Sequence, residues 1–319
     1  MRNTFLEDVP FLVGPHSSET SYVTSILSGI FGQSVISYGA TFVDFPEVAG
    51  PKSNMLRTVP SNVFRIKALM DIVRKLRWNY VSVISSYGFD GERDARYFIQ
   101  ESVNLKICFG SIHDLPRATK SSDYRDVLQD IAKDSRTRIV LLFTNMKDSS
   151  SILEAATKLR LVDRFQFFCV LGCTNDKEVV TGSEEVALGT LSLDLHNYAN
   201  SDFEKYFRNL EPDQRQGEED SYFRDFWELH FNCSLRRSNP ENLKSGEKSE
   251  ETSKKWTDAA QRKRPLPCSG EERLTNVEFL KDVPAHTVIS AVYALACAAR
   301  DIVHNICGET HKGDVFFLI

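Results

Sequence analysis

Strand-like and helix-like segments alternate along most of this 319-residue chain, and this alternation restricts its fold more than any single motif does. Apolar residues at helical spacing over 20–31 precede a strand pattern at 34–38, and a helical pattern over 61–76 precedes a strand at 80–84. Units of about 30 residues, each a strand and then a helix, are typical of βαβ crossovers. The sequence therefore predicts an α/β fold with mostly parallel sheets. The other expected elements are helices at 92–103, 124–131 and 152–159 and strands at 107–109, 139–143 and 165–171.

The apolar content of the expected strands indicates how the sheet is covered. The strand at 139–143 reads Ile-Val-Leu-Leu-Phe, without a polar residue. Continuous apolar strands are typical of a sheet that has helices on both faces. We therefore expect two layers of helices around the sheet.

The alternation breaks in the C-terminal part of the chain. An acidic loop is expected at 210–221, and the many Ser, Lys, Glu and Asn residues of 236–276 predict a long solvated excursion. One more long helix follows over 288–303. At the two ends, a helix is expected near the start without a strand before it, and 313–319 is mostly apolar. We therefore expect both ends to be cut from a longer chain.

Composition narrows the class of protein. Apolar residues make up 41% and charged residues 26%, which is ordinary for a globular protein. The net charge of −5 argues against nucleic acid as the main partner, because a basic face is the usual footprint of such binding. No apolar run approaches the roughly 18 residues that a membrane helix requires. Glu7, Asp8 and Pro10 interrupt the start, so no signal peptide is expected.

No arrangement of residues predicts catalysis, a cofactor or a metal site. The seven histidines are scattered, without HExxH spacing or an adjacent nucleophile motif. The sequence contains no GxGxxG, GxxxxGK[ST] or GxSxG motif, and its cysteines match neither a zinc ribbon nor a CxxC pair. An enzyme is therefore the weaker hypothesis, and a binding protein the stronger one.

The seven cysteines fall into different types. Cys169 and Cys173 lie in or beside an apolar strand and Cys297 lies in a helix, so we expect buried free thiols at these positions. Cys233 and Cys268 bracket the polar excursion, and a bridge between them would close a loop of roughly 36 residues, worth ~3–4 kcal/mol in the loop-entropy model.

A glycosylation sequon is also present. Asn232-Cys233-Ser234 has the pattern Asn-x-Ser. Modification of Asn232 is expected only in a secreted context, because the sequon acts only there.

Two loops carry polar residues where an α/β sheet binds ligands. The segment 14–18 leads into a helix, so its hydroxyls and free N–H groups can meet an anion such as a carboxylate. The structural alternative is a simple N-cap, with Ser18 or Thr20 capping that helix as Ser61 can cap the helix at 61–76. The segment 37–41 lies at the carboxyl end of a strand, and a structural turn is its alternative reading.

Several stretches in order carry a stronger signal than any one of them. They are Gly14-Pro15-His16-Ser17-Ser18, Ser37-Tyr38-Gly39-Ala40-Thr41, Leu56-Arg57-Thr58-Val59-Pro60-Ser61, Arg77-Trp78-Asn79-Tyr80-Val81-Ser82, Asp225-Phe226-Trp227-Glu228 and Ala291-Val292-Tyr293-Ala294-Leu295-Ala296. This ordered set resembles the extracellular Venus-flytrap domain of class C G-protein-coupled receptors, most of all the metabotropic glutamate receptors.

The resemblance implies a two-lobed flytrap of the type I periplasmic-binding-protein-like fold, with parallel sheets. Residues 1–57 would form the first lobe, with its N-terminal part incomplete, and 58–192 the second lobe. Residues 193–319 would return to the first lobe, with a polar disordered loop at 236–276. Such a receptor signals when its lobes close on a ligand.

The resemblance also implies a ligand site, with changes. Ser18 and Thr41 occupy positions that hold an amino acid's α-carboxylate and α-amino groups, and Gly39, inside the 37–41 motif, is a further candidate ligand contact. Asn62 stands where the family has an aspartate, and Asp90 where it has a tyrosine. Thr174 aligns with an acidic position, and a lysine used for glutamate falls near Pro284. We therefore expect either a changed amino-acid-like ligand or a flytrap that has lost amino-acid binding.

The remaining implications concern partners and location. The resemblance implies the extracellular portion of a cell-membrane glycoprotein, a homo- or heterodimer through the first lobe, and a G protein reached through an absent membrane domain. It pairs Cys233 with Cys268, and it leaves Cys108 and Cys307 to cysteines outside the chain. The candidate dimer residues are Val23, Leu27, Ile30 and Leu69, unless they simply pack on the sheet.

Three alternatives remain open at this stage. One is a ligand-silent flytrap that serves as a dimer partner. Another is the ectodomain of a receptor guanylate cyclase, whose hormone-binding lobes share this architecture. The third is a soluble α/β enzyme, which would need a catalytic group that the sequence does not display.

Overall fold

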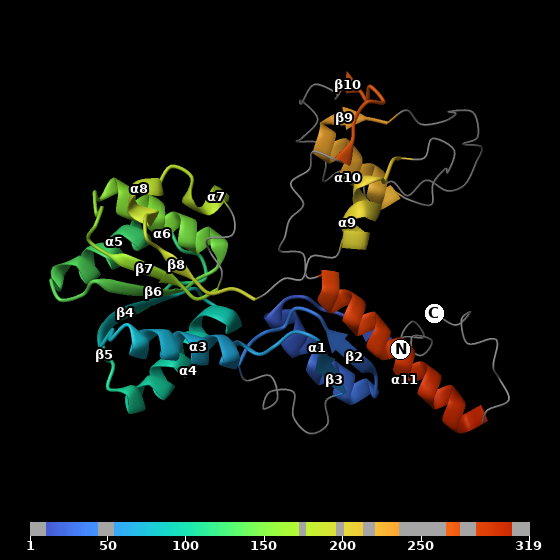
Figure 1. Ribbon diagram of the computed structural model, residues 1–319, viewed down its shortest axis with the longest axis horizontal. Coiled ribbons are helices and arrows are strands. Elements are labelled where there is room, and N and C mark those ends of the chain that lie inside the picture. Colours follow the sequence, from blue (N-terminus) through green and yellow to red (C-terminus); the bar gives the residue numbers. More distant parts are fainter. Residues whose placement is uncertain are drawn as a thin grey trace, which may run out of the picture. The chain divides into compact units, whose positions relative to one another are not determined.

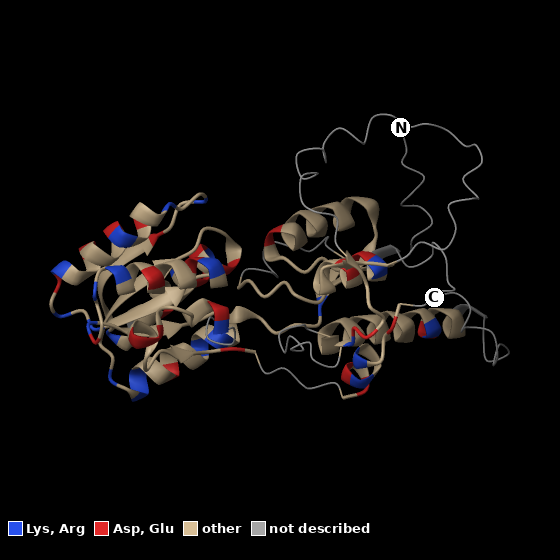
Figure 2. Ribbon diagram, turned by 90° about the horizontal axis from the view of Figure 1, so that it is seen from above, with Lys and Arg blue, Asp and Glu red and all other residues tan. Residues whose placement is uncertain are grey.

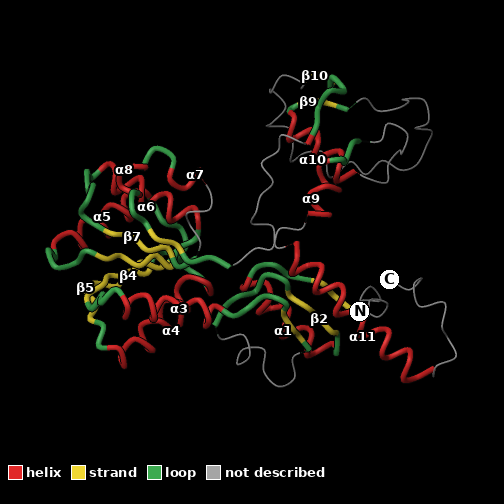
Figure 3. Tube along the Cα trace, in the orientation of Figure 1, coloured by secondary structure: helices red, strands yellow, loops and turns green. Residues whose placement is uncertain are grey.

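The computed structural model describes residues 11–43, 54–171, 177–195, 201–212, 221–235, 266–274 and 285–307. The chain divides into two units, which are described separately. The α/β unit comprises Met1–Tyr198 with Asp282–Ile319, and the small unit comprises Ala199–Lys281. Figures 1 and 3 show the helices and strands of both units.

A three-stranded parallel sheet opens the α/β unit. Its strands are β1 (Phe11–Val13), β2 (Ser34–Ser37) and β3 (Met55–Arg57), in the order β1-β2-β3. The expectation that no strand precedes the first helix is therefore wrong, because β1 lies just before α1 (Ser18–Phe31). A small core of Val35, Ala40, Phe42 and Met55 lies beside this sheet.

A five-stranded parallel sheet follows in the same unit, in the order β5-β4-β6-β7-β8. Helices lie on both of its faces, as Figure 1 shows. The strands are β4 (Tyr80–Ser85), β5 (Cys108–Asp114), β6 (Ile139–Phe143), β7 (Gln166–Cys169) and β8 (Leu191–Ser192). The helices are α3 (Asn62–Lys75), α4 (Asp94–Ser102), α5 (Ser121–Lys133), α6 (Met146–Lys158), α7 (Lys177–Val180) and α8 (Glu184–Ala187). Two short helical segments, η1 (Phe89–Arg93) and η2 (Val103–Leu105), flank α4.

Strand β6 shows why its sequence has no polar residue. Val140 and Leu142 point into one core, shared with α5 and α6, while Leu141 and Phe143 point into the other, shared with α3 and α4. Successive side chains of a strand face opposite sides of the sheet, so a sheet covered on both faces needs apolar residues at every position. The prediction of an α/β fold with parallel sheets is confirmed.

Helix α1 buries its serine side and exposes its apolar side, whereas an apolar stripe on a helix is usually the buried side. Its buried residues are Ser18, Ser21, Ser25 and Ser28. Its apolar residues are 45% to 70% exposed, and they are Val23, Ile26, Leu27, Ile30 and Phe31. Small buried hydroxyls can bond to the helix backbone itself, as Ser28 Oγ does by donating to the carbonyl of Ser25 at 2.9 Å.

The N-cap prediction is wrong for α1 and right for α3. The N-cap of α1 is Ser17, whose side chain accepts a hydrogen bond from the Thr20 N–H, so the prediction of Ser18 or Thr20 is wrong by one position or more. Ser61 caps α3, as predicted. Leu69 of α3 is fully buried in the core, which removes it from the candidate dimer residues.

Helix α11 (Ala285–Cys307) returns to the three-stranded sheet and contacts β1. The Thr287 hydroxyl donates to the carbonyl of Tyr38 at 3.0 Å, and the Thr58 hydroxyl donates to the carbonyl of Thr287 at 2.8 Å. These bonds tie the end of the chain to segments more than two hundred residues earlier.

Helix α11 is more apolar than the sequence led us to expect of any segment. Among the described residues one helix, over Ala285–Asn305, is long and apolar enough to cross a membrane by length and composition alone. The expectation that no segment would reach this threshold is therefore wrong. In its sequence Arg300 and Asp301 are the only Lys, Arg, Asp or Glu residues, and Figure 2 shows most of this helix in tan.

The small unit is built from α9 (Ser201–Arg208), α10 (Ser221–Phe231), β9 (Cys233–Ser234) and β10 (Leu266–Pro267). Trp227 and Leu274 are buried together, and a disulfide joins Cys233 to Cys268 with an S–S distance of 2.08 Å. Most of the expected loops at 210–221 and 236–276 lies outside the described residues. Of its described end, 266–274, most residues are exposed, as predicted, while Leu274 is fully buried.

Two of the cysteine predictions are wrong. Cys169 is disulfide-bonded rather than a free thiol. Cys297 is a free thiol but is exposed on α11 rather than buried. Cys108 is also free and exposed. Cys173 lies outside the described residues.

Candidate functional site

Two loops at the carboxyl ends of neighbouring parallel strands form one side of the candidate site. The loop after β1 turns at Gly14, whose N–H donates to the carbonyl of Ile36 at 2.8 Å. The Ser37 hydroxyl then donates to the carbonyl of Pro15 at 2.6 Å and accepts from the N–H of Ala40 at 3.1 Å. These bonds hold the loops after β1 and β2 together.

Gly39 lies where these two loops touch. A Cβ at this position would stand 2.6 Å from the carbonyl oxygen of His16 and 2.5 Å from its Cδ2. The close approach to a backbone atom, rather than an unusual φ angle, therefore requires glycine. Gly39 thus acts as a spacer in the site.

Substituting Gly39 by alanine should lower the stability of the α/β unit by about 1–3 kcal/mol, since overpacking against backbone forces a local shift. The measurement is urea unfolding followed by the fluorescence of Trp78, with Trp227 and Trp256 replaced by phenylalanine in every variant. Gly32→Asn is the matched control, because Gly32 has φ 69° and nothing within 4 Å of the added Cβ. Equal stability of Gly39→Ala and the wild type would show that the loops are not in contact.

A loop of the five-stranded sheet forms the other side of the site. Segment η1 follows β4, and the carboxylate of Asp90 in it accepts a hydrogen bond from the Ser18 hydroxyl at 2.8 Å. The same oxygen, Oδ1, accepts from the Thr41 hydroxyl at 3.1 Å. The neighbouring Phe89 N–H donates to Oε1 of Glu19 at 3.1 Å. The structure thus brings Ser18, Thr41 and Asp90 together.

Asn62 joins the same group through its backbone. Its N–H donates to the carbonyl of Thr41 at 2.7 Å, and its side-chain Nδ2 donates to Oδ2 of Asp94 at 2.5 Å. Both Asn62 and Asp94 are almost completely buried, and Oδ1 of each has no hydrogen-bond partner. Nε of Arg65 is also buried without a partner, so the unsatisfied atoms of the described residues here include a donor as well as two side-chain oxygens.

Asp94 was not among the predicted site residues. A signal for it exists in the sequence, because it lies on the apolar side of α4 with Ala95 and Phe98, both buried. An acid at such a position is expected to be neutral or paired, since burial of an isolated charge is costly. The position of Asp94 in the helical pattern of α4 therefore marks it as a candidate site residue.

The electrostatics of the site are dominated by buried acids. Burial, and then the nearby charge of Asp90, raises the pKa of Asp94 from 3.8 to about 8. Burial also raises the pKa of Asp90, although the hydrogen bonds from Ser18 and Thr41 oppose that rise. Burial lowers the pKa of the Arg65 guanidinium, which the surrounding acids partly offset. The arrangement therefore suits a hydrogen-bond donor or a cation better than a second anion.

Other predicted residues lie elsewhere. Thr174 and Pro284 are outside the described residues. Asn232 is exposed in a turn of the small unit. In the described part of the chain, the group with metal-ligand spacing is Cys233, Cys268 and Glu272, but its two sulfur atoms form the disulfide and are not available as thiolates.

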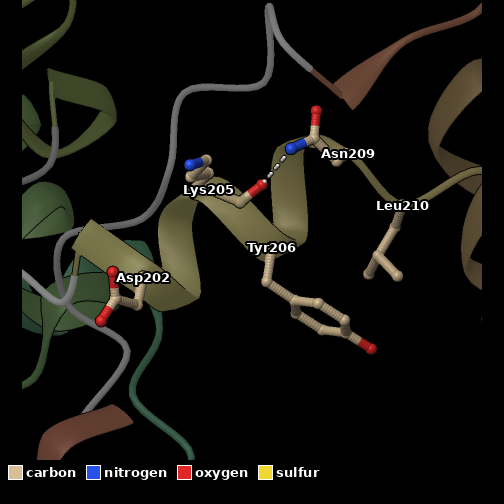
Figure 4. Close-up of a pocket in the computed structure, with 5 residues that line it drawn as sticks. All are labelled: Asp202, Lys205, Tyr206, Asn209 and Leu210. Atoms are coloured by element: carbon tan, nitrogen blue, oxygen red, sulfur yellow. Dashed lines mark hydrogen bonds between the residues drawn. The ribbon is translucent and has the colours of Figure 1, made fainter.

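A separate open pocket lies on α9 of the small unit. It is lined by Asp202, Lys205, Tyr206, Asn209 and Leu210, as Figure 4 shows. Its internal bond is the donation of Asn209 Nδ2 to the carbonyl of Lys205 at 2.9 Å. It contains none of the predicted site residues.

Comparison with known proteins gives consistent results. Residues 3–314 match the family described as "Receptor family ligand binding region". The chain is 28% identical over 307 residues to metabotropic glutamate receptor 6 of Oryctolagus cuniculus, covering 94% of this chain and 32% of that protein. It is 27% identical over 252 residues to the metabotropic glutamate receptor of Drosophila melanogaster, covering 79% of this chain and 25% of that protein. The chain spans a quarter to a third of the length of these relatives.

Proposed function

The chain belongs to the family of receptor ligand-binding regions, and from that premise we propose that it is the ligand-binding part of a metabotropic glutamate receptor-like G-protein-coupled receptor. In this proposal two α/β lobes close on a small amino-acid-like ligand, and closure is the signal. The glutamate site is altered, because Asn62 and Asp90 replace an acid and an aromatic ring. The chain performs no catalysis of its own; the relatives it matches are named as receptors.

One observation carries this proposal. Ser18 and Thr41 come from the loops after β1 and β2, whereas Asp90 comes from the loop after β4 of the other sheet. The two sheets therefore meet through polar groups at the ends of their strands, where open α/β sheets bind ligands. A ligand that favours the closed arrangement must bind it more tightly than the open one.

The lobe boundaries follow from the same proposal. Residues 1–57 form the first lobe, 58–192 the second, and 193–319 return to the first. The bonds from Thr287 to Tyr38 and from Thr58 to Thr287 support this return, because they join α11 to the three-stranded sheet.

The proposal places the chain outside the cell, as the extracellular portion of a membrane receptor. The exposed apolar side of α1 supports a dimer through the first lobe, with Val23, Leu27 and Ile30 in the interface. A G protein acts through a membrane domain outside this chain. Asn232 is accessible for glycosylation, because it is exposed in its turn.

A ligand-silent flytrap that serves as a dimer partner is the second candidate function. Its support is the occupation of both site hydroxyls by Asp90, which leaves neither free to donate to a ligand.

The test is amide hydrogen exchange on the full-length protein, with and without a panel of amino acids and amines. We expect at least one compound to slow exchange in both 15–22 and 85–95, because closure protects both loops. In Ser18→Ala, the ligand concentration needed for the same protection should be at least tenfold higher. The exposed Ser135→Ala is the matched control. A panel without any effect on either segment would leave the ligand-silent candidate.

A further inference from the structure

Asp90 engages the two site hydroxyls in an unusual way. Ser18 Oγ and Thr41 Oγ1 both donate to the same oxygen, Oδ1, at 2.8 and 3.1 Å. Each hydroxyl has a single proton to donate, so neither remains available for an external acceptor. Hydrogen bonds to an ionised carboxylate are also about twice as strong as neutral ones.

The position of Asp90 is fixed by the residues around it. The Phe89 ring lies 5.3 Å from those of Tyr22 and Phe42, and the Arg93 guanidinium lies 3.8 Å above its centroid. Gly88 has φ 118°, and a Cβ there would stand 2.6 Å from Oε1 of Glu19. Glycine therefore lets Glu19 reach the Phe89 N–H, and segment η1 is anchored at Phe89, the residue before Asp90.

The charges near these hydroxyls disfavour a second carboxylate. Asp90 and Glu19 are acids at this site, and burial opposes the charge of Arg65. Two further bases have other partners: Arg57 donates to the carbonyls of Ala40 and Phe42, and Arg93 lies over the Phe89 ring. Two carboxylates that share one site cannot both stay ionised without cost. A bound carboxylate would therefore have to displace Asp90 and also overcome its repulsion.

The unsatisfied buried atoms of this region include two side-chain oxygens and also a donor, Nε of Arg65. Oδ1 of Asn62 and Oδ1 of Asp94 are buried without a hydrogen-bond partner. Burial of an acceptor without a donor costs about 1–3 kcal/mol. A ligand N–H donor can satisfy the amide oxygen of Asn62, whereas a carboxylate adds another acceptor and needs a donor such as Nε of Arg65.

We propose that Asp90 determines the specificity of this site, by occupying the Ser18 and Thr41 hydroxyls in place of a ligand's carboxylate. The site then takes a cationic amine that lacks an α-carboxylate and rejects the corresponding amino acid. This inference rests on the proposed function, because it assumes that the two hydroxyls belong to the ligand site.

The experiment compares two matched pairs of probes on the full-length protein, 2-phenylethylamine with L-phenylalanine and cadaverine with L-lysine. Isothermal titration should show that the wild type binds the amine of at least one pair at least tenfold more tightly than its amino acid. In Asp90→Ala the order should reverse, because the hydroxyls become free and the opposing charge is lost. Asp90→Asn should weaken the amine without strengthening the amino acid, since the amide oxygen still accepts from both hydroxyls.

The controls separate this inference from the proposed function. Asp126→Ala, an exposed aspartate on α5, should bind all four probes as the wild type does. Hydrogen exchange over 139–158 verifies that each variant is folded, and Asp90→Ala should speed exchange in 15–22 and 85–95. Tighter binding of an amino acid than of its amine by the wild type overturns the inference and keeps the proposed function. Absence of binding of every probe by both the wild type and Asp90→Ala also overturns it.

Discussion

Replacing Asp94 by asparagine should remove a pH dependence of stability that is centred on the candidate site. Between pH 4 and pH 8 the folded protein holds a proton on Asp94, whose pKa is raised to about 8, while the unfolded chain has lost it at 3.8. The unfolded state then binds fewer protons, so the free energy of unfolding falls by about 1.4 kcal/mol per pH unit as the pH rises through this window. Below pH 4 and above pH 8 this contribution is level.

The asparagine variant resembles the protonated acid and can still accept from Asn62 Nδ2. We therefore expect its free energy of unfolding, minus that of the wild type, to grow by roughly 5 kcal/mol in total from pH 4 to pH 8. Urea titrations at several pH values measure this difference through Trp78 fluorescence, with Trp227 and Trp256 replaced by phenylalanine in every variant. Asp126→Asn is the control, because its side chain is exposed. A difference that stays constant across the pH range would contradict the burial of an uncompensated acid.

Removing the Cys233–Cys268 disulfide should destabilise the small unit by about 4 kcal/mol, the loop-entropy value for the sequence separation of 35 between the two cysteines. The effect is large for this unit because few other residues support it: its described core consists of Trp227, Cys233 and Leu274 with partly buried neighbours. The double variant Cys233→Ala/Cys268→Ala should therefore expose Trp227, which is now buried.

Hydrogen exchange in α10 measures this loss directly, because its amides report the opening of the small unit. Cys108→Ala is the matched control, since Cys108 is a free and exposed thiol. Exchange over β6 should stay unchanged in the double variant. Protection of α10 within a factor of ten of the wild type would show that packing alone holds this unit.

The repeating pattern of the chain explains which parts of the fold were predictable. Strand β6 was predicted at its observed bounds, because its apolar run is long enough to be distinguished from a loop. Strands β1 and β3 were missed, since each has only three residues and neither shows a clear period. The family assignment from ordered motifs is confirmed, because several short motifs at the right spacing are more specific than any one of them.

Helix α1 shows where a period alone misleads. The apolar spacing identified the helix correctly but does not say which side is buried. Four serines on the opposite side are small enough for close packing, and their hydroxyls can be satisfied locally. Burial therefore followed size and local hydrogen bonding rather than hydrophobicity.

The candidate site was predictable in its residues but not in their connections. Ser18, Thr41, Asn62 and Asp90 were named from motif positions, and the structure places them in one hydrogen-bonded group. That Asp90 itself bonds both hydroxyls depends on the meeting of two separate sheets, which no local pattern encodes. The cysteine at 169 shows the same limit, because an apolar strand does not reveal a bridge.

The hydrogen bonds of Asp90 also affect how a free carboxylate would compete for Ser18 and Thr41. Because Asp90 is part of the same chain as Ser18 and Thr41, its carboxylate is presented to them at an effective concentration that dilution cannot lower. In the proposed site, a free carboxylate that competes for these hydroxyls must therefore displace a group that the fold already holds there.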